Sequence, residues 1–127
     1  MLTSRKKIGD LERAVMDVLW DAKDGDLLTV REVHALLADE RDIAYTTVMT
    51  VMDRLARKGM VEQLREGRAY TYRARASRGE MTAELMRGTL DEFAEHDRRT
   101  ALAAFVGDAS AEDLATLRQA LAELERR

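Results

Sequence analysis

Residues 45–59 carry the sequence YTTVMTVMDRLARKG, which sorts its side chains onto two sides of a helix. At about 100° per residue, hydroxyl and charged groups fall on one arc and apolar groups on the other. The polar arc holds Thr46, Thr47, Thr50, Asp53, Arg54, Arg57 and Lys58. The apolar arc holds Val48, Met49, Val51, Met52, Leu55 and Ala56. We therefore predict a helix from Tyr45 to Lys58, closed by Gly59, whose apolar arc packs on a core.

The polar arc is unusual for a face that meets only solvent. Each threonine costs a helix about 0.5 kcal/mol relative to alanine, because its χ1 angle is restricted. A threonine hydroxyl can instead hydrogen-bond a base edge or a phosphate, and residues near the start of a recognition helix reach the bases. The arc therefore favours DNA binding. The alternative is that Thr46 or Thr47 merely caps the helix and that the arginines are solvated.

Two helices and a short strand are predicted before this segment. The apolar spacing of Leu11, Val15, Val18, Leu19 and Ala22 predicts a helix over residues 10–22, stopped by the sequence Asp24-Gly25-Asp26. Leu27 and Leu28 follow as a short strand. Thr29 and Glu32 form a capping box that opens a second helix, which should end near residue 39 or 40.

A hairpin is predicted after Gly59. The β-like runs cover residues 60–65 and 69–74 and are joined by Glu66-Gly67. Arg65, Arg68, Arg73 and Arg75 would present guanidinium groups to backbone phosphate or the minor groove. Tyr70 and Tyr72 alternate onto one face, which we expect to pack on the core. The order helix, strand, helix, helix, hairpin is the winged-helix arrangement.

The last third of the chain consists of helix formers. Ser77 and Glu80 form a second capping box, and the apolar face that follows includes Leu85, Leu90 and Phe93. We expect a break between residues 95 and 99, a short apolar helix around residues 101–106, an interruption at 107–108, and a last helix capped by Ser110. Leucines in that helix repeat in a heptad-like seam formed by Leu114, Leu117, Leu121 and Leu124.

The fold class predicted is mainly α with a small β-hairpin. A winged helix-turn-helix DNA-binding domain spans residues 1–76, and a helical dimerisation domain spans residues 77–127. The first domain is too small to bury all the apolar faces that follow it, so we expect a homodimer whose contacts include Leu85, Leu90, Phe93, Leu102, Phe105, Leu114, Leu117, Leu121 and Leu124. The alternative is an intrachain helical hairpin. The DNA contacts predicted are Thr46, Thr47, Thr50, Arg54, Arg57, Lys58, Arg65 and Arg68.

Charge and composition narrow the function classes. The net charge is −3, but residues 54–75 hold seven basic and two acidic residues, a local excess of +5, whereas residues 77–127 are net acidic. The chain has no cysteine, which excludes disulfides, thiolate nucleophiles and cysteine-ligated metals. His34 and His96 stand alone, and no catalytic motif occurs, so we expect no enzyme, no metal and no cofactor. The basic residues 1–7 lead into Asp10 and Glu12, so no signal peptide or membrane span is expected and the location predicted is cytoplasmic.

Several segments resemble the family of penicillinase and methicillin-resistance repressors, and in particular its mycobacterial member. They are residues 11–20 (LERAVMDVLW), 29–33 (TVREV), 44–55 (AYTTVMTVMDRL) and 66–70 (EGRAY), and with the helical tail they cover nearly the whole chain. The resemblance implies a homodimer on a palindromic operator upstream of β-lactamase-type resistance genes. It also implies a membrane-bound sensor protease that relieves repression by cutting the C-terminal part.

The vulnerable bond of that family falls between Ala104 and Phe105 in this chain, where familiar members have asparagine in place of Ala104. The related copper-responsive repressors carry a cysteine-rich tail that binds Cu(I) through thiolates, and the lack of cysteine excludes that mechanism here. Two other functions stay open. One is a winged-helix module used for protein contacts, because a fold does not dictate function. The other is a regulator released by a small molecule bound between the winged and helical parts, although the sequence shows no pocket.

Overall fold

The computed structural model of the protein describes residues 8–23 and 25–127. The basic segment 1–7, which bears on the predicted lack of a signal peptide, and Asp24 of the predicted helix stop lie outside the described residues. The chain divides into two compact units, residues 1–88 and 89–127. The predicted functional division after residue 76 stays a prediction, and the structural division falls later, within a helix.

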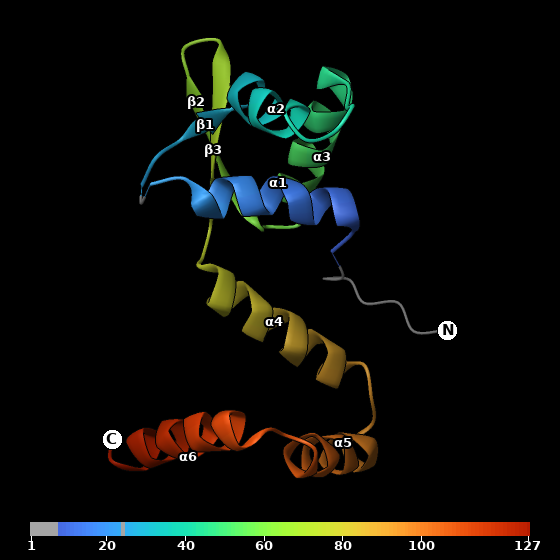
Figure 1. The fold of residues 1–127 in the computed structure, drawn as a ribbon, viewed down its shortest axis with the longest axis vertical. Helices are drawn as coiled ribbons and strands as arrows, with labels where there is room; N and C mark the ends of the chain where they lie inside the picture. Colours follow the sequence, from blue (N-terminus) through green and yellow to red (C-terminus); the bar gives the residue numbers. More distant parts are fainter. Residues whose placement is uncertain (1–7, 24) are drawn as a thin grey trace. The chain divides into compact units, whose positions relative to one another are not determined.

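The first unit has the predicted winged-helix order. It consists of α1 (Asp10–Asp21), β1 (Leu28–Thr29), α2 (Val30–Ala38), α3 (Tyr45–Arg57), β2 (Val61–Glu66) and β3 (Ala69–Ala74), followed by most of α4 (Arg78–Asp91). The strands form one antiparallel sheet in the order β1-β3-β2, with Leu28 opposite Tyr72 and Glu66 opposite Ala69. The three helices lie on one side of this sheet (Figure 1).

Local signals set the ends of these helices as predicted. The Thr29 hydroxyl accepts from the Glu32 N–H at 3.1 Å, and the Glu32 carboxylate accepts from the Thr29 N–H at 2.9 Å. At the end of α3, the Met60 N–H donates to the Leu55 carbonyl at 3.0 Å, while Gly59 takes a left-handed φ of +75°. This is a Schellman motif, which favours glycine at the left-handed position.

The apolar arc of α3 provides the centre of the core. Val48, Met52 and Leu55 are completely buried and Val51 nearly so, packed with Val15 and Met16 of α1 and other apolar side chains. The prediction is wrong for Met49, which is 44% exposed. Met49 lies at the edge of the apolar arc, on the part of the helix surface that faces the hairpin instead of the core, and no element covers it there.

The two tyrosines of β3 also differ from the prediction. Tyr72 is buried opposite β1, and its hydroxyl accepts from Gln63 Nε2 at 2.8 Å. Tyr70 is 43% exposed, so it does not pack on the core as expected. The reason is that β1 pairs with β3 only opposite residues 71 and 72, and the hairpin extends beyond that point towards its tip.

The second unit contains the end of α4, then α5 (Glu95–Gly107) and α6 (Ala111–Glu125). The predicted break between residues 95 and 99 is wrong, since α4 ends at Asp91 and α5 begins at Glu95. Ala94 adopts an extended conformation and its carbonyl accepts from the Arg98 N–H, which starts the new helix. Acidic residues in its first turn, Glu95 and Asp97, favour a helix beginning there. The predicted Ser110 cap of α6 is confirmed by its bond to the Asp113 N–H at 3.0 Å.

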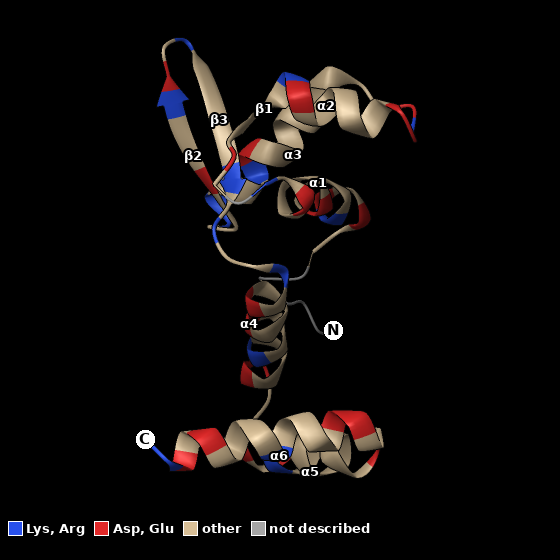
Figure 2. Cartoon of the chain, turned by 60° about the vertical axis from the view of Figure 1, so that its left-hand side comes forward, with Lys and Arg blue, Asp and Glu red and all other residues tan. Residues whose placement is uncertain are grey.

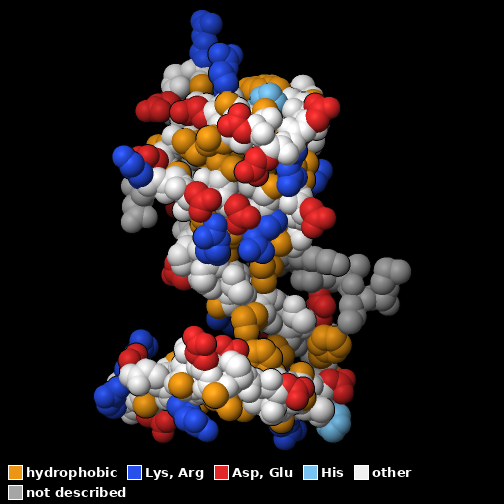
Figure 3. All heavy atoms as spheres, in the orientation of Figure 1, with side chains coloured by type: hydrophobic (Ala, Val, Ile, Leu, Met, Phe, Trp, Pro, Cys, Tyr) orange, Lys and Arg blue, Asp and Glu red, His pale blue; other side chains and the backbone are white. Residues whose placement is uncertain are grey.

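No described residue of α5 or α6 is buried within the chain. Leu102 is 44%, Phe105 53%, and Leu121 and Leu124 each 59% exposed, and apolar side chains reach the surface of these helices in Figure 3. Leu114 and Leu117 are only partly covered. The seam that the sequence predicts is therefore present on α6 but is left open by the single chain. In the described part of the chain, no helix is long and apolar enough to cross a membrane.

Candidate nucleic-acid interface

The first turns of α3 expose the predicted threonines. Helix α3 begins at Tyr45 with Ala44 as its N-cap, and no side chain caps it. Thr46 and Thr47 therefore lie inside the helix, and the alternative that one of them serves as the cap is wrong. Thr46, Thr47 and Thr50 are all exposed, and the Thr50 hydroxyl donates to the Thr46 carbonyl at 2.9 Å. That bond fixes the Thr50 rotamer while leaving its oxygen able to accept from a partner.

Two arginines continue the same exposed arc. Arg54 is exposed and forms no ion pair with any described residue. Arg57 bonds Asp53 at 2.9 Å, with 81% of the Arg57 side chain exposed. An exposed pair four residues apart stabilises a helix by only about 0.3–0.5 kcal/mol. Both guanidinium groups are therefore available to phosphates.

Lys58 differs from the other predicted DNA contacts. Its Nζ lies 2.8 and 3.0 Å from the two carboxylate oxygens of Glu12, whose second partner is the Gly9 N–H at 3.0 Å. Burial raises the pKa of Glu12, but the bonds from Lys58 and Gly9 and the positive charges of Lys58 and Arg54 together outweigh this and hold that pKa below its ordinary value. Because Glu12 is 6% exposed, the pair joins α1 to the end of α3 as an internal contact. We therefore assign Lys58 a structural role.

The hairpin turns through Gly67 and Arg68, one residue later than predicted. The first loop residue, Gly67, has a φ of +64°, whereas Arg68 has a negative φ, as does every described residue other than glycine. A positive φ at the first loop position alone identifies a type II′ turn. Arg68 is exposed at the tip, which is blue in Figure 2. The Arg65 guanidinium lies over the Tyr70 ring at 5.6 Å, and its Nε donates to the Gly67 carbonyl.

Not all of the basic excess in residues 54–75 is available to a polyanion. Arg73 pairs with Glu62 at 2.8 Å and Arg75 with Glu84 at 2.6 Å, besides the Lys58 pair with Glu12. Glu12 and Glu84 lie outside that window, so counting charges within it overstates the positive surface. The exposed cations that remain are those of α3 and the hairpin tip.

A groove lies between the start of α2, α3 and the hairpin. We call it the α3–wing groove; its volume is about 470 Å³, and its lining comprises Thr29, Val30, Arg31, Tyr45, Met49, Arg68, Ala69, Tyr70 and Tyr72. Its only charged residues are arginines. The sequence patterns do not predict Arg31, Tyr45 and Met49 as surface residues of this region. For Arg31 a signal was available, because it lies outside the apolar stripe of α2.

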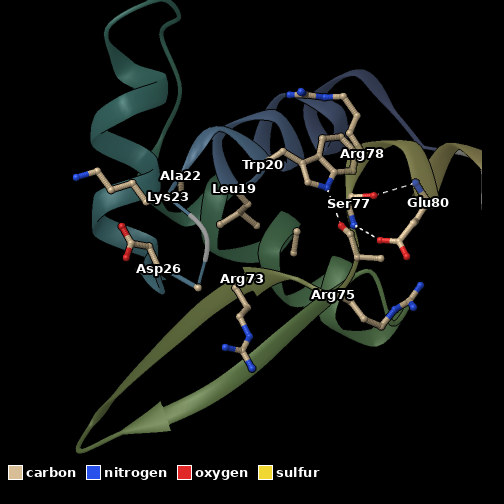
Figure 4. Close-up of a pocket in the computed structure, with 13 residues that line it drawn as sticks. Leu19, Trp20, Ala22, Lys23, Asp26, Arg73, Arg75, Ser77, Arg78 and Glu80 are labelled. Atoms are coloured by element: carbon tan, nitrogen blue, oxygen red, sulfur yellow. Dashed lines mark hydrogen bonds between the residues drawn. The ribbon is translucent and has the colours of Figure 1, made fainter.

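A second hollow of about 470 Å³ lies where β3 leads into α4 (Figure 4). The Trp20 Nε1–H donates to the Ala76 carbonyl at 3.0 Å, and the Arg78 guanidinium lies 5.1 Å from the Trp20 ring centre while it bonds Asp17 and Asp21. Glu80 caps the start of α4 by accepting from the Ser77 N–H. These partners give the charged groups a structural role, which is to hold the start of α4 against α1.

We expect Trp20→Phe to lower the free energy of unfolding by about 1–2 kcal/mol, because it removes the bond to Ala76 and leaves that carbonyl short of a partner. Urea unfolding followed by far-UV circular dichroism measures the change. Arg13→Ala removes another cation facing the same ring, at 6.0 Å, and should cost less than about 0.5 kcal/mol. Equal effects of the two substitutions would contradict the role assigned to the indole bond.

Comparison with known proteins identifies the family. The family model described as penicillinase repressor matches residues 8–123. The chain belongs to the penicillinase repressor family. The transcriptional regulator BlaI of Mycobacterium tuberculosis is 48% identical over 120 residues, which cover 94% of this chain and 86% of that protein. The resemblance seen in the sequence is thus confirmed, and the matched relatives of this chain are transcriptional regulators rather than enzymes.

Solved structures agree with the winged-helix fold. The DNA-binding domain of the repressor BlaI has a TM-score of 0.52 and 25% identity, covering 62% of this chain and 93% of that domain. A complex structure of hsRosR-S1 has a TM-score of 0.51 and 20% identity, covering 89% of the present chain and 97% of that chain. The second likeness concerns the fold alone. Among residues 8–23 and 25–127, no cluster of histidine or acidic side chains is arranged to hold a metal ion.

Proposed function

We propose that this chain is a dimeric transcriptional repressor that binds palindromic operator DNA of β-lactamase-type resistance genes. The observation that carries the proposal is the exposed arc of α3, where threonine hydroxyls and the Arg54 guanidinium lie together on a helix whose opposite side buries Val48, Val51, Met52 and Leu55 in the core. A helix of this kind enters the major groove with its first turns towards the base edges.

The proposed contacts divide between reading and positioning. Thr46, Thr47 and Thr50 face the bases, while Arg54 and Arg57 reach phosphates along the groove. The Tyr45 and Thr46 N–H groups lie in the first turn of α3, where a helix has no internal acceptors and favours an anion. Arg65 and Arg68 on the hairpin add phosphate or minor-groove contacts. This set omits Lys58, which pairs with Glu12.

The exposed apolar faces of α5 and α6 are proposed to pack against a second copy of the chain. Large apolar residues of both helices, Leu102 and Phe105 of α5 and Leu121 and Leu124 of α6, are more than two-fifths exposed, and grouped exposed apolar side chains mark an interaction site. A two-fold dimer would present two recognition helices to half-sites about 34–36 Å apart, or at a multiple of that spacing. This is the geometry that a palindromic operator requires.

Relief of repression is proposed to occur by cleavage between Ala104 and Phe105 by a membrane-bound sensor protease. This bond lies inside α5, and the Ala104 carbonyl accepts from the Asp108 N–H at 3.1 Å. A protease needs an extended segment, so the last turn of α5 must unwind before the cut. Incubation with the activated sensor and weighing of the fragments tests this: intact protein, or a cut at another bond, would contradict it.

Salt dependence tests the DNA contacts. Each phosphate contact contributes about −0.9 to the slope of log affinity against log salt concentration. Arg54→Ala and Arg68→Ala should each make the slope of a dimer shallower by nearly 2, because each is present twice. Arg126→Ala at the end of α6 is the control and should leave the slope unchanged. Fluorescence anisotropy with the labelled promoter duplex upstream of the gene measures these slopes.

Sequence preference should respond to different residues. Thr47→Ala is expected to reduce the ratio of operator to scrambled-duplex affinity about tenfold per half-site, with the salt slope kept, because each base contact carries roughly 1–3 kcal/mol of discrimination. Failure of the wild-type protein to bind any duplex at low salt would favour the rival function, a winged-helix module for protein contacts.

A further inference from the structure

The α3–wing groove exposes large apolar side chains on an otherwise polar and cationic face. Met49 is 44%, Tyr45 42% and Tyr70 43% exposed. Tyr45 and Met49 lie one helical turn apart and therefore on the same side of α3. Met49 also borders Thr46 on the helix surface, since the two residues are three positions apart. An apolar contact point thus lies directly beside the hydroxyls of the polar arc.

The walls of this groove are held in place by contacts within the protein. The Tyr45 ring meets the His34 ring edge-on, at 5.8 Å between centres and 77° between planes. His34 Nε2 is in turn 2.8 Å from the Ile43 carbonyl oxygen. On the opposite wall, the Arg65 guanidinium covers the Tyr70 ring. Met49 is the flexible, polarisable side chain between these rigid walls, and such a side chain adapts to a small apolar group.

Charge restricts what this groove can receive. Arg31 and Arg68 are the charged residues of its lining, which contains no carboxylate. The hollow in Figure 4, in contrast, is lined by Asp26 and Glu80 as well as by basic residues. A ligand suited to the α3–wing groove therefore carries anionic groups at its edges and a small apolar group between them. A DNA strand fits this description where a thymine presents its C5 methyl in the major groove.

We propose that Met49 determines specificity by contacting the methyl group of a thymine at one position of each operator half-site. Tyr45 forms the wall beside that methyl group, and Arg31 and Arg68 contact phosphates of the same strand. The inference rests on the proposed function, to which it adds a preference for thymine over cytosine and over a thymine without its methyl group.

Deoxyuridine substitution tests the contact, because deoxyuridine lacks only the methyl group. The probe is the promoter duplex that the wild-type protein protects upstream of its own gene, with one thymine pair, symmetric across the two half-sites, replaced at a time. Burying one methyl group stabilises by about 0.8 kcal/mol, so the wild-type affinity should fall about fourfold per half-site at one such position. Met49→Ala should bind the deoxyuridine duplex as tightly as the thymine duplex. Met49→Leu should keep most of the wild-type fall in affinity on deoxyuridine substitution.

The control variant is Met86→Ala, which truncates another half-exposed methionine on α4 and should keep the wild-type response to deoxyuridine. The thermal midpoint of Met49→Ala should stay close to that of the wild type, because the side chain is not part of the core. Equal losses in wild type and Met49→Ala at every thymine would overturn this inference while leaving the repressor function intact. A wild-type protein with no preference for the promoter duplex over a scrambled one would overturn the proposed function itself.

Discussion

Lys58→Met should lower the free energy of unfolding at pH 7 by about 2–3 kcal/mol. The substitution leaves the Glu12 carboxylate, which is 6% exposed, without the ammonium group that now lies 2.8 Å away. Breaking a buried pair from one side costs roughly 3–5 kcal/mol, and the partial exposure of Lys58 places the effect here at or below the low end. Urea unfolding followed by circular dichroism measures it.

The double variant Glu12→Gln with Lys58→Met is the control for this prediction. It removes both charges and should recover most of the loss, since a neutral pair needs no compensation in a buried position. The difference in free energy of unfolding between the wild type and Lys58→Met should also depend on pH. The pKa of Glu12 is lowered in the folded protein from an ordinary value of 4.5, so its contribution is present above that value and is lost as the pH falls through the folded pKa. The gap between wild type and Lys58→Met should therefore close in acid, and a gap that is constant with pH would contradict the assignment.

Leu121→Asp should convert the protein to monomers at micromolar concentration and weaken operator binding by about 100-fold or more. Leu121 is 59% exposed in the single chain, so a carboxylate there is tolerated by the monomer but not in an apolar interface between two copies. Separate monomers lose the effective concentration that links the two half-sites, which is worth roughly 10²–10⁴ in affinity. Sedimentation velocity and anisotropy on full and half operators measure both effects.

Gln119→Asp provides the matched control on α6. Gln119 is exposed and lies across the helix from the leucine seam, so this substitution should leave the dimer intact. Leu121→Asp should still bind a half operator, because a folded monomer presents one recognition helix. That result would show that the substitution prevents dimerisation and not folding. A wild-type protein that sediments as a monomer would defeat the dimer proposal, and a Leu121→Asp protein that remains a dimer would show that α6 is not its interface.

Local patterns predicted much of this fold because the forces that set them act within a few residues. The capping pairs at Thr29 and Ser77 and the glycine at position 59 each lie where the sequence places them. The predicted position of the break after α4 is wrong because neither glycine nor proline marks the true one. The acidic residues that open α5 were the available signal.

Long-range contacts account for the remaining differences. The partner of Lys58 lies 46 residues away in the sequence, and no periodicity connects the two. The exposure of Met49 and Tyr70 depends on where the neighbouring layer ends, which a helical wheel or strand alternation does not contain. These are the residues at which the candidate interface departs most from its prediction.

Helix α3 is fixed at both of its ends: Tyr45 rests on His34 at the first turn, and Lys58 is tied to Glu12 after the last. A helix held in this way meets its target as a preformed rigid surface, so little rearrangement precedes docking. The encounter rate should then depend on diffusion and ionic strength alone. Changes on the exposed arc should alter chiefly how long each complex lasts before it dissociates.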